Sequence, residues 1–225
     1  MILQALTLTL RLAVTVSAIL LIIGIPLAYW LAFSPRRWKF VVEALVSLPL
    51  VLPPTVLGFY LLVALGPLSP LGRWYQDITG HPLAFTFAGL VIGSVVYSLP
   101  FAVQPMATSF AAVDRKLLQA SALLGASRWR TFWRILLPLG LPGVLSGFVL
   151  SFAHTLGEFG VVLMIGGNIP GATRTISILI FDQVEALDYA AANRTALLLL
   201  ALCFALLATL YGLRRRAAWR LWEWR

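Results

Sequence analysis

Charged side chains are scarce in this sequence. Only 11% of the 225 residues are charged and 60% are hydrophobic, whereas about a quarter of the residues in a soluble domain are charged. Several apolar stretches reach the roughly 20 residues that a bilayer-spanning helix needs. The composition therefore excludes an ordinary soluble domain and predicts a membrane protein.

Cysteine and histidine are nearly missing as well. Cys203 is the only cysteine, which excludes a disulfide framework and a cysteine-based metal site. The two histidines, His81 and His154, are too few for a histidine-rich metal site. No metal ion and no other cofactor is therefore expected.

A glycine-rich phosphate-binding loop is also absent. The only lysines, Lys39 and Lys116, follow Trp38 and Arg115 with no glycine-rich run before them, so a P-loop that cradles ATP phosphates is excluded. Any ATP-driven process in which the chain takes part needs another subunit to hydrolyse the nucleotide. The chain itself is not expected to be an enzyme.

The net charge of +9 follows an expected membrane topology and does not require a nucleic-acid partner. Three basic residues, Arg73, Arg174 and Arg194, fall in segments on one side of the apolar stretches, and Arg11 lies near the interface on that side. The other thirteen of the seventeen Lys and Arg fall on the opposite side: Arg36, Arg37, Lys39, Arg115, Lys116, Arg128, Arg130, Arg134, Arg214, Arg215, Arg216, Arg220 and Arg225. This asymmetry predicts a cytoplasmic C-terminus and a periplasmic N-terminus.

The apolar stretches predict an all-α, polytopic membrane protein that forms one domain over residues 1–225. A loop is expected at 66–82, and residues 176–189 resemble a short amphipathic helix on the outer side. That helix would be a sixth span if it entered the bilayer. The tail, residues 214–225, is basic and aromatic, which is typical of an anchor on an anionic lipid surface. The five expected spans are residues 6–33, 41–65, 84–113, 137–165 and 195–213.

Proline and glycine are expected to interrupt these helices. Pro49, Pro53 and Pro54 remove backbone donors, and the freed carbonyl groups must be satisfied by neighbouring helices or by water lining a cavity. Residues 49–54 are therefore either part of a pathway through the membrane, with Pro53 and Pro54 at its centre, or a structural kink. Further bends or breaks are expected at Pro100, Pro105, Pro138, Pro142 and Gly157. Close helix contacts are expected at the small-residue faces Gly89-x3-Gly93 and Gly143-x3-Gly147.

Glu158 is an ionisable residue within an apolar stretch, which marks it as a candidate for a gate. It could equally form a packing hydrogen bond that stabilises the bend at Gly157, with His154 or a neighbouring helix as its partner. Ser151 and His154 share a helix face, which leaves an intramembrane hydrolase as a remote alternative. No third group that would orient the histidine is evident.

A loop with polar side chains follows, at residues 166–175. Asn168, Thr173, Arg174 and Thr175 supply an amide, two hydroxyl groups and a guanidinium group, which suit a passing oxyanion. A rigid docking loop for an extracytoplasmic partner explains the same residues.

A polar and basic segment, residues 114–134, lies between two apolar stretches. It has the size of a short helix, a glycine turn and a second helix, on the cytoplasmic side. Its sequence pattern is Gln119-Ala120-Ser121-x3-Gly125-x9-Ile135-x-Leu137-Pro138. This pattern resembles the motif E-A-A-x3-G-x9-I-x-L-P of binding-protein-dependent ABC importer permeases, with Gln119 and Ser121 replacing the first and third residues.

In that family the motif forms a coupling helix that sits in a cleft of the ATPase subunit. The resemblance therefore implies a type I ABC importer permease fold and a contact with an ATPase. The residues that it assigns to this contact are Gln119, Ala120, Ser121, Leu124, Gly125, Ala126, Arg128 and Trp129.

Three further runs, residues 48–58, 155–160 and 167–175, resemble the molybdate branch of the sulfate, molybdate and tungstate importers. The resemblance implies a multi-pass protein of the bacterial inner membrane that works as a homodimer. Its other partners would be two cytoplasmic ABC ATPase subunits, a periplasmic oxyanion-binding protein and the lipid bilayer. A sulfate, thiosulfate or tungstate permease of the same design remains open. A passive channel or an ion-coupled carrier leaves the segment 114–134 unexplained.

Overall fold

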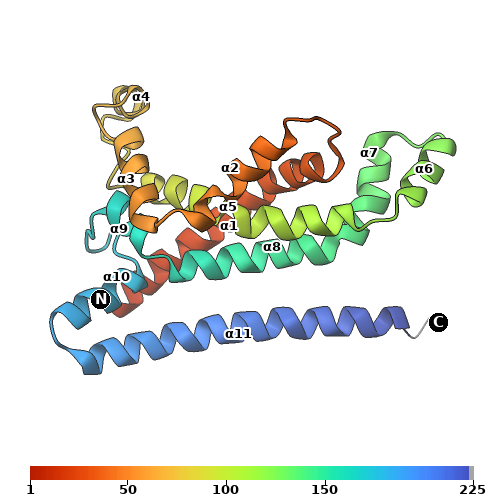
Figure 1. Cartoon of the computed structure of the whole chain (residues 1–225). Helices are drawn as coiled ribbons and strands as arrows, with labels where there is room; N and C mark the ends of the chain where they lie inside the picture. The colour runs from red at the N-terminus through yellow and green to blue at the C-terminus, as the bar shows by residue number, and fades with distance from the viewer. Residues whose placement is uncertain (223–225) are drawn as a thin grey trace.

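The computed structural model describes residues 1–222, and every regular element in that range is helical (Figure 1). Three long helices form the centre of the bundle, namely α1 (Ile2–Phe33), α5 (Phe87–Ala111) and α8 (Leu137–Gly157). Their shared core contains Leu12, Val16, Leu90, Met106 and Phe110, all fully buried. Apolar side chains on every turn of these helices explain this arrangement, because each helix can pack inward and still face lipid outward.

In the described part of the chain, four helical segments are long and apolar enough to cross a membrane: α1, α5, Arg128–Gly157 and Tyr189–Thr209. A fifth span is formed if α2 (Lys39–Val51) and α3 (Pro54–Leu65) are taken together, although the pair is bent by 113°. The five predicted spans therefore correspond to these elements. The remaining candidate, α10 (Ile176–Glu185), has ten residues and is about 15 Å long, which is too short to span a bilayer.

The prolines act differently in different helices. The break between α2 and α3 lies at Leu52 and Pro53, as the prolines in this stretch predict. By contrast, α5 continues through both of its prolines, and α8 continues through Pro142. The predicted break at Pro142 is therefore wrong. The predicted break at Pro138 is wrong as well, because Pro138 lies inside the continuous helical segment Arg128–Gly157, directly after a π-helix. Gly157 ends the helix as predicted.

The predicted loop at 66–82 contains a helix, α4 (Pro70–Thr79). Its start has a capping signal, because the Ser69 hydroxyl accepts a hydrogen bond from the Gly72 N–H at 2.8 Å. Its end has a second signal, because Gly80 adopts a left-handed conformation with φ of 79°. The many glycine and proline residues in this stretch predicted a loop, although Ser69 and Gly80 are the caps of a short helix.

The small-residue faces bring helices together as predicted. A Cβ atom added at Gly143 would lie 2.2 Å from the Ser109 Cβ, and one at Gly147 would lie 2.5 Å from the Ala102 carbonyl oxygen. Gly93 likewise faces Ile165, whose Cδ1 would lie 2.5 Å from an added Cβ. The first two contacts join α8 to α5, and the third joins α5 to α9 (Gly160–Gly166).

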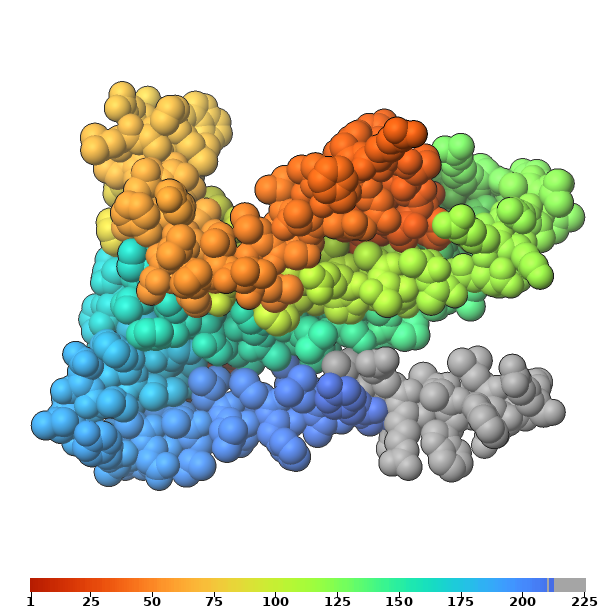
Figure 2. All heavy atoms as spheres, viewed as in Figure 1, coloured from red at the N-terminus to blue at the C-terminus, as the bar shows by residue number. Residues whose placement is uncertain are grey.

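The remaining elements gather at opposite ends of the bundle (Figure 1). At one end lie α4, α9 and α10, and Figure 2 shows α3 and α4 projecting there. At the other end lie α6 (Arg115–Leu123) and α7 (Arg128–Thr131). The last helix, α11 (Tyr189–Trp222), packs on α10 and α8. Of the predicted anchoring tail, residues 214–222 continue this helix, and residues 223–225 lie outside the described part of the chain.

Candidate functional site

The segment 114–134 forms the predicted helix, turn and helix. The Asp114 carboxylate caps α6 by accepting a hydrogen bond from the Lys116 N–H at 2.9 Å, and Ser127 caps α7 in the same way through the Arg130 N–H. Between them Gly125 has φ of 74°, a conformation that glycine adopts with little cost. The short polar caps and the glycine thus explain why this stretch leaves the bundle as a separate unit.

The tip of this unit is apolar and exposed. Leu124 is 88% exposed, and its neighbour Leu123 is exposed to a similar extent. Gln119, Ala120 and Gly125 are exposed as well, and Ala126 is half-buried. An exposed pair of leucines on a polar loop is typical of a surface that docks on another protein.

Two residues assigned to the ATPase contact have other partners. Ser121 is buried, and its hydroxyl is hydrogen-bonded to the Thr131 hydroxyl at 2.8 Å, which joins α6 to α7. Trp129 packs against Phe132 and Trp133. Together with Arg128, Trp129 also lines a cavity of about 570 Å³ whose opposite wall is α1. Ser121 therefore stabilises the unit internally, whereas Trp129, 71% exposed, stays on the surface of the unit.

Behind α7 the chain continues into the membrane without a break. A five-residue π-helix, Phe132–Leu136, leads directly into α8. The continuous segment Arg128–Gly157 has 30 residues, which corresponds to about 45 Å of helix. It connects the exposed unit at one end of the molecule to the residues around Gly157 near the other end.

Gly157 and Glu158 lie at a second site, a cavity of about 520 Å³ between α3, α5, α8 and α9. The structure brings three predicted pathway residues together here, namely Pro54, His154 and Glu158. Pro53 precedes them as the extended residue at the start of α3. Thr55 and Tyr97 also line this cavity, which we call the polar pocket. The sequence did not single out these two, since nothing in their local pattern separates them from ordinary helix residues.

His154 makes specific contacts in the polar pocket. Its Nδ1 lies 2.9 Å from the Ser98 hydroxyl oxygen, which is also 3.0 Å from the Thr155 hydroxyl oxygen. Its ring stacks on Phe101, with 4.0 Å between the ring centroids. Ser151 instead donates a hydrogen bond to the Phe148 carbonyl oxygen. Because Ser151 and His154 are not hydrogen-bonded to each other, the nucleophile and base of a hydrolase are not formed, and that alternative is not supported.

Glu158 is the extended residue that follows α8, and only 3% of its surface is exposed. Neither carboxyl oxygen has a hydrogen-bond partner among the described residues. The predicted pairing with His154 is therefore not observed, because His154 is bound to Ser98 instead. A buried carboxyl group without a partner is rare in folded proteins and marks a site of function.

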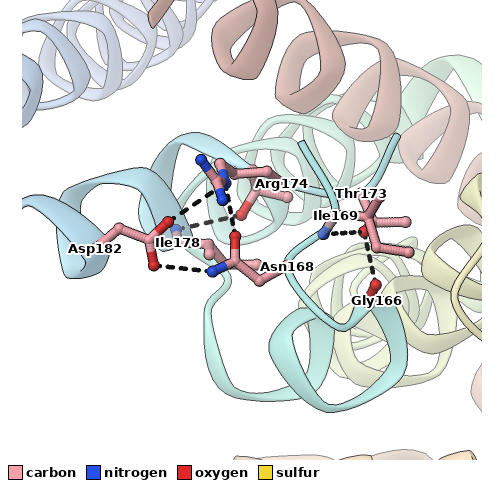
Figure 3. Close-up of polar contacts among 8 residues, drawn as sticks. Gly166, Asn168, Ile169, Thr173, Arg174, Ile178 and Asp182 are labelled. Atoms are coloured by element: carbon pink, nitrogen blue, oxygen red, sulfur yellow. Dashed lines mark hydrogen bonds and ion pairs between the residues drawn. The ribbon is translucent and has the colours of Figure 1, made fainter. Parts of the chain in front are cut away.

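The loop 166–175 forms a closed polar network (Figure 3). Arg174 donates a hydrogen bond from Nε to the Asn168 Oδ1 at 2.7 Å, and the same nitrogen lies 3.3 Å from the Asp182 Oδ2. Asn168 Nδ2 in turn donates to the Asp182 Oδ1 at 2.9 Å. Asp182, on α10, is the partner that sequence analysis missed, because it lies fourteen residues from Asn168.

The two threonines of this loop are also occupied. Thr173 donates to the Gly166 carbonyl oxygen at 2.6 Å and accepts from the Ile169 N–H at 3.0 Å. Thr175 caps α10. Each of the four predicted side chains thus bonds within the loop and α10. The geometry favours a rigid loop over an arginine that is free to bind an oxyanion.

Comparisons with known proteins agree with this architecture. Residues 24–217 match the family model of the binding-protein-dependent transport system inner membrane component. The chain is 51% identical over 213 residues to the molybdenum transport system permease protein ModB of Azotobacter vinelandii, covering 95% of this chain and 94% of the relative. It is 39% identical over 178 residues to the ModB protein of Escherichia coli (strain K12), covering 77% and 78%.

Among solved structures, the MetNI methionine ABC transporter in an inward-facing conformation has a similar fold. The TM-score is 0.75 at 16% sequence identity, and the match covers 96% of this chain and 95% of that one. At this identity the likeness concerns the fold alone, that of an ABC importer permease. With the family match over most of the sequence, it leads to one conclusion: the chain belongs to the family of inner membrane components of binding-protein-dependent transport systems.

Proposed function

We propose that this chain is the membrane-spanning subunit of an ATP-driven importer that passes molybdate from a periplasmic binding protein into the cytoplasm. The observation that carries the proposal is the 51% identity to a molybdenum transport permease over nearly the full length of both chains. The exposed helical unit at 114–134 supports the coupling to a separate ATPase, because the chain has no P-loop of its own.

The proposed mechanism couples two ends of the molecule. Two ATPase subunits dock on the exposed unit, with contacts from the tip residues Leu124 and Gly125. ATP binding closes the ATPases and pulls the units of two permease copies together. The continuous segment Arg128–Gly157 transmits this movement, since a packed helix moves as a rigid body. The movement reaches the polar pocket at Gly157 and Glu158, where the pathway opens outward, and hydrolysis resets it.

A second copy of the chain completes the pathway in this proposal. The polar pocket lies beside α3, and Phe59, Tyr60 and Val63 on α3 are exposed and apolar. An apolar face that large needs either lipid or protein to cover it. A second copy related by a twofold axis can cover this face of α3, because the same surface of each copy then forms the contact.

The periplasmic binding protein docks on the opposite end, at the loop 166–175 and α4. The closed Asn168–Arg174–Asp182 network supports this role, because a rigid loop loses little conformational freedom on binding. Substrate selectivity then belongs mainly to the binding protein. The permease supplies a gated route with few buried charges.

The experiment that tests the proposal is uptake of labelled molybdate in cells that lack their own importer. The chain is expressed with its ATPase and binding protein, and co-purification of the ATPase verifies assembly. ATP-dependent molybdate uptake that resists excess sulfate is expected, with competition from tungstate. Uptake abolished by modest sulfate would move the assignment to a sulfate permease. No oxyanion uptake by the assembled complex would contradict the proposal.

The coupling role is tested in the same assay with Gly125→Asp. Gly125 has φ of 74° and open space around it, and Gly171 in the outer loop has φ of 76° and is equally open. Aspartate adopts this left-handed conformation less readily than glycine, so the substitution strains the backbone in the same way at both positions. Gly125→Asp is expected to abolish ATPase coupling while the protein stays in the membrane. Gly171→Asp, in the proposed docking loop of the binding protein, is expected to leave co-purification of the ATPase unchanged, whatever its effect on uptake. Normal transport by Gly125→Asp would contradict the coupling assignment.

A further inference from the structure

Glu158 is a buried carboxyl group without a charged partner. Neither of its oxygens makes a hydrogen bond with a described residue. The two ion pairs in the described part of the chain are Lys39–Glu43 and Arg174–Asp182, and neither involves Glu158. A carboxylate buried in an apolar interior without a cation or hydrogen bonds is costly. No cation and no hydrogen bond of good geometry from the described residues offsets this cost.

The groups that face Glu158 are neutral or already engaged. The Ser94 hydroxyl of α5 lies beside the Glu158 carboxyl, yet it also lacks a hydrogen bond of good geometry. Tyr97, on the next turn of α5, and Thr55, on α3, also line the polar pocket, and both carry neutral hydroxyl groups. His154 is bound to Ser98 and stacked on Phe101. No lysine, arginine or aspartate lines this pocket.

A third buried polar group without a partner lies on α1, which packs against α5. The Ser17 hydroxyl is fully buried and has no hydrogen-bond partner among the described residues. The hydroxyl groups of Ser17 and Ser94 and the Glu158 carboxyl group are thus all buried without a hydrogen-bond partner.

The position of Glu158 on the backbone adds to this picture. It follows the last residue of α8, where the free carbonyl groups of the helix carry partial negative charge. A carboxylate is unfavourable at this end of a helix, whereas a carboxylic acid can donate a hydrogen bond to a carbonyl oxygen. The N–H groups that open α9 make no hydrogen bond to the Glu158 carboxyl.

We propose that Glu158 is a protonated carboxylic acid and that it acts in the polar pocket as a hydrogen-bond donor to the passing oxyanion. The proposal rests on the proposed function, because that function supplies the oxyanion. A carboxylate would repel a tetrahedral dianion, whereas an acid O–H donates a short hydrogen bond to it. The hydroxyl groups of Thr55 and Tyr97 provide further neutral donors. A site of neutral donors holds the anion weakly enough to release it.

Protonation is tested with dicyclohexylcarbodiimide, an apolar reagent, on the purified complex with its ATPase. The protonated carboxyl adds its O–H across one C=N bond of the reagent, and the O-acylisourea that results rearranges to a stable N-acylurea with no leaving group. Peptide mass spectrometry is expected to find one added reagent molecule on Glu158. Glu43, which is exposed and paired with Lys39, is the matched control and is expected to remain unmodified. An unmodified Glu158 overturns the proposal.

The donor role is tested by comparing Glu158→Gln with Glu158→Ala in the uptake assay. Glutamine keeps a neutral N–H donor of similar shape, whereas alanine removes it. The glutamine variant is expected to take up molybdate about tenfold faster than the alanine variant, since one hydrogen bond to a charged group corresponds to roughly that factor. Equal rates for the two variants, whether both are fast or both slow, overturn the donor role.

The two experiments also separate this proposal from the proposed function. If the assembled wild-type complex takes up no oxyanion but Glu158 is modified by the carbodiimide, the import function fails and the protonated state stands. If oxyanion uptake is normal and Glu158 is not modified, the import function stands and the protonated donor fails.

Discussion

The contacts of Arg174 favour a structural role over direct binding of an oxyanion. Its charge and position suit an oxyanion ligand, yet its Nε is shared between Asn168 and Asp182. Arg174 and Asp182 have side chains that are 22% and 28% exposed, so solvent weakens the ion pair between them. Two further hydrogen bonds through Asn168 close the network.

We expect Arg174→Ala and Asp182→Ala to have the same effect, because each breaks one shared network. Each variant should lower the free energy of unfolding, and the double variant should be no less stable than either single one. The coupling between the two positions should be about 1 kcal/mol, given their partial exposure. Detergent denaturation of the purified chain measures all four proteins.

Transport rates distinguish the two roles of Arg174. In a purely structural network, Arg174→Ala and Asp182→Ala reduce molybdate uptake to a similar extent. An arginine that binds the oxyanion directly gives a different pattern. In that case Arg174→Ala abolishes uptake, while Asp182→Ala preserves it or increases it by freeing the guanidinium group.

At the scale of single elements, close packing explains why proline and glycine mean different things in different helices. In α8 the glycines 140, 143 and 147 lie directly against α5, and the Gly140 carbonyl oxygen accepts a hydrogen bond from the Ser109 hydroxyl at 3.2 Å. Such contacts hold the helix together through Pro142. Between α2 and α3 the two consecutive prolines, at 53 and 54, remove two successive donors, and the chain turns by 113°.

Gly143→Ala should destabilise the α5–α8 contact. The added Cβ would lie 2.2 Å from the Ser109 Cβ and 2.6 Å from the Pro105 carbonyl oxygen, so the helices have to move apart. Overpacking of this kind costs about 1–3 kcal/mol. The midpoint of detergent-induced unfolding measures the loss.

Gly212→Ala is the matched control for that variant. Gly212 lies in α11, and an added Cβ there would meet no atom within 4 Å. Alanine favours a helix over glycine by about 0.5–1 kcal/mol, so this variant should be as stable as the original chain or slightly more stable. Equal destabilisation by both substitutions would show that the α5–α8 contact does not determine the stability.

Local patterns in the sequence predict where the helices lie, but they do not predict which side chains contact one another. Apolar stretches indicated the spans, and the pattern from Gln119 to Pro138 indicated the exposed helical unit. The helix α4 does not follow from the sequence pattern, because the glycines and prolines of 66–82 indicate a loop, whereas Ser69 and Gly80 cap a short helix there. The pairs His154 with Ser98 and Asn168 with Asp182 could not be predicted, because the residues of each pair lie 56 and 14 positions apart. Only packing brings them together.

For the whole molecule, the two ends of the bundle carry different chemistry. One end holds the polar loop 166–175 with α4, and the other holds the exposed unit with its flanking basic residues (Figure 1). The basic loop between α1 and α2, with Arg36 and Arg37, lies at the same end as the exposed unit. Positive charge collected at one end of a helical bundle predicts which end faces the cytoplasm.

This orientation predicts how cysteines react when they are introduced at two leucine positions with similar exposure. Leu68, before α4, is 84% exposed, and Leu124, at the tip of the exposed unit, is 88% exposed. In a chain whose single native thiol is removed by Cys203→Ala, Leu68→Cys should react with a membrane-impermeant maleimide applied to the outer face of the inner membrane in spheroplasts. Leu124→Cys should react only after the membrane is permeabilised. Because both positions are equally open within the chain, access to the reagent depends on the side of the membrane. The reverse pattern would mean that the exposed unit faces the periplasm, where no ATP is available to an ATPase docked on it.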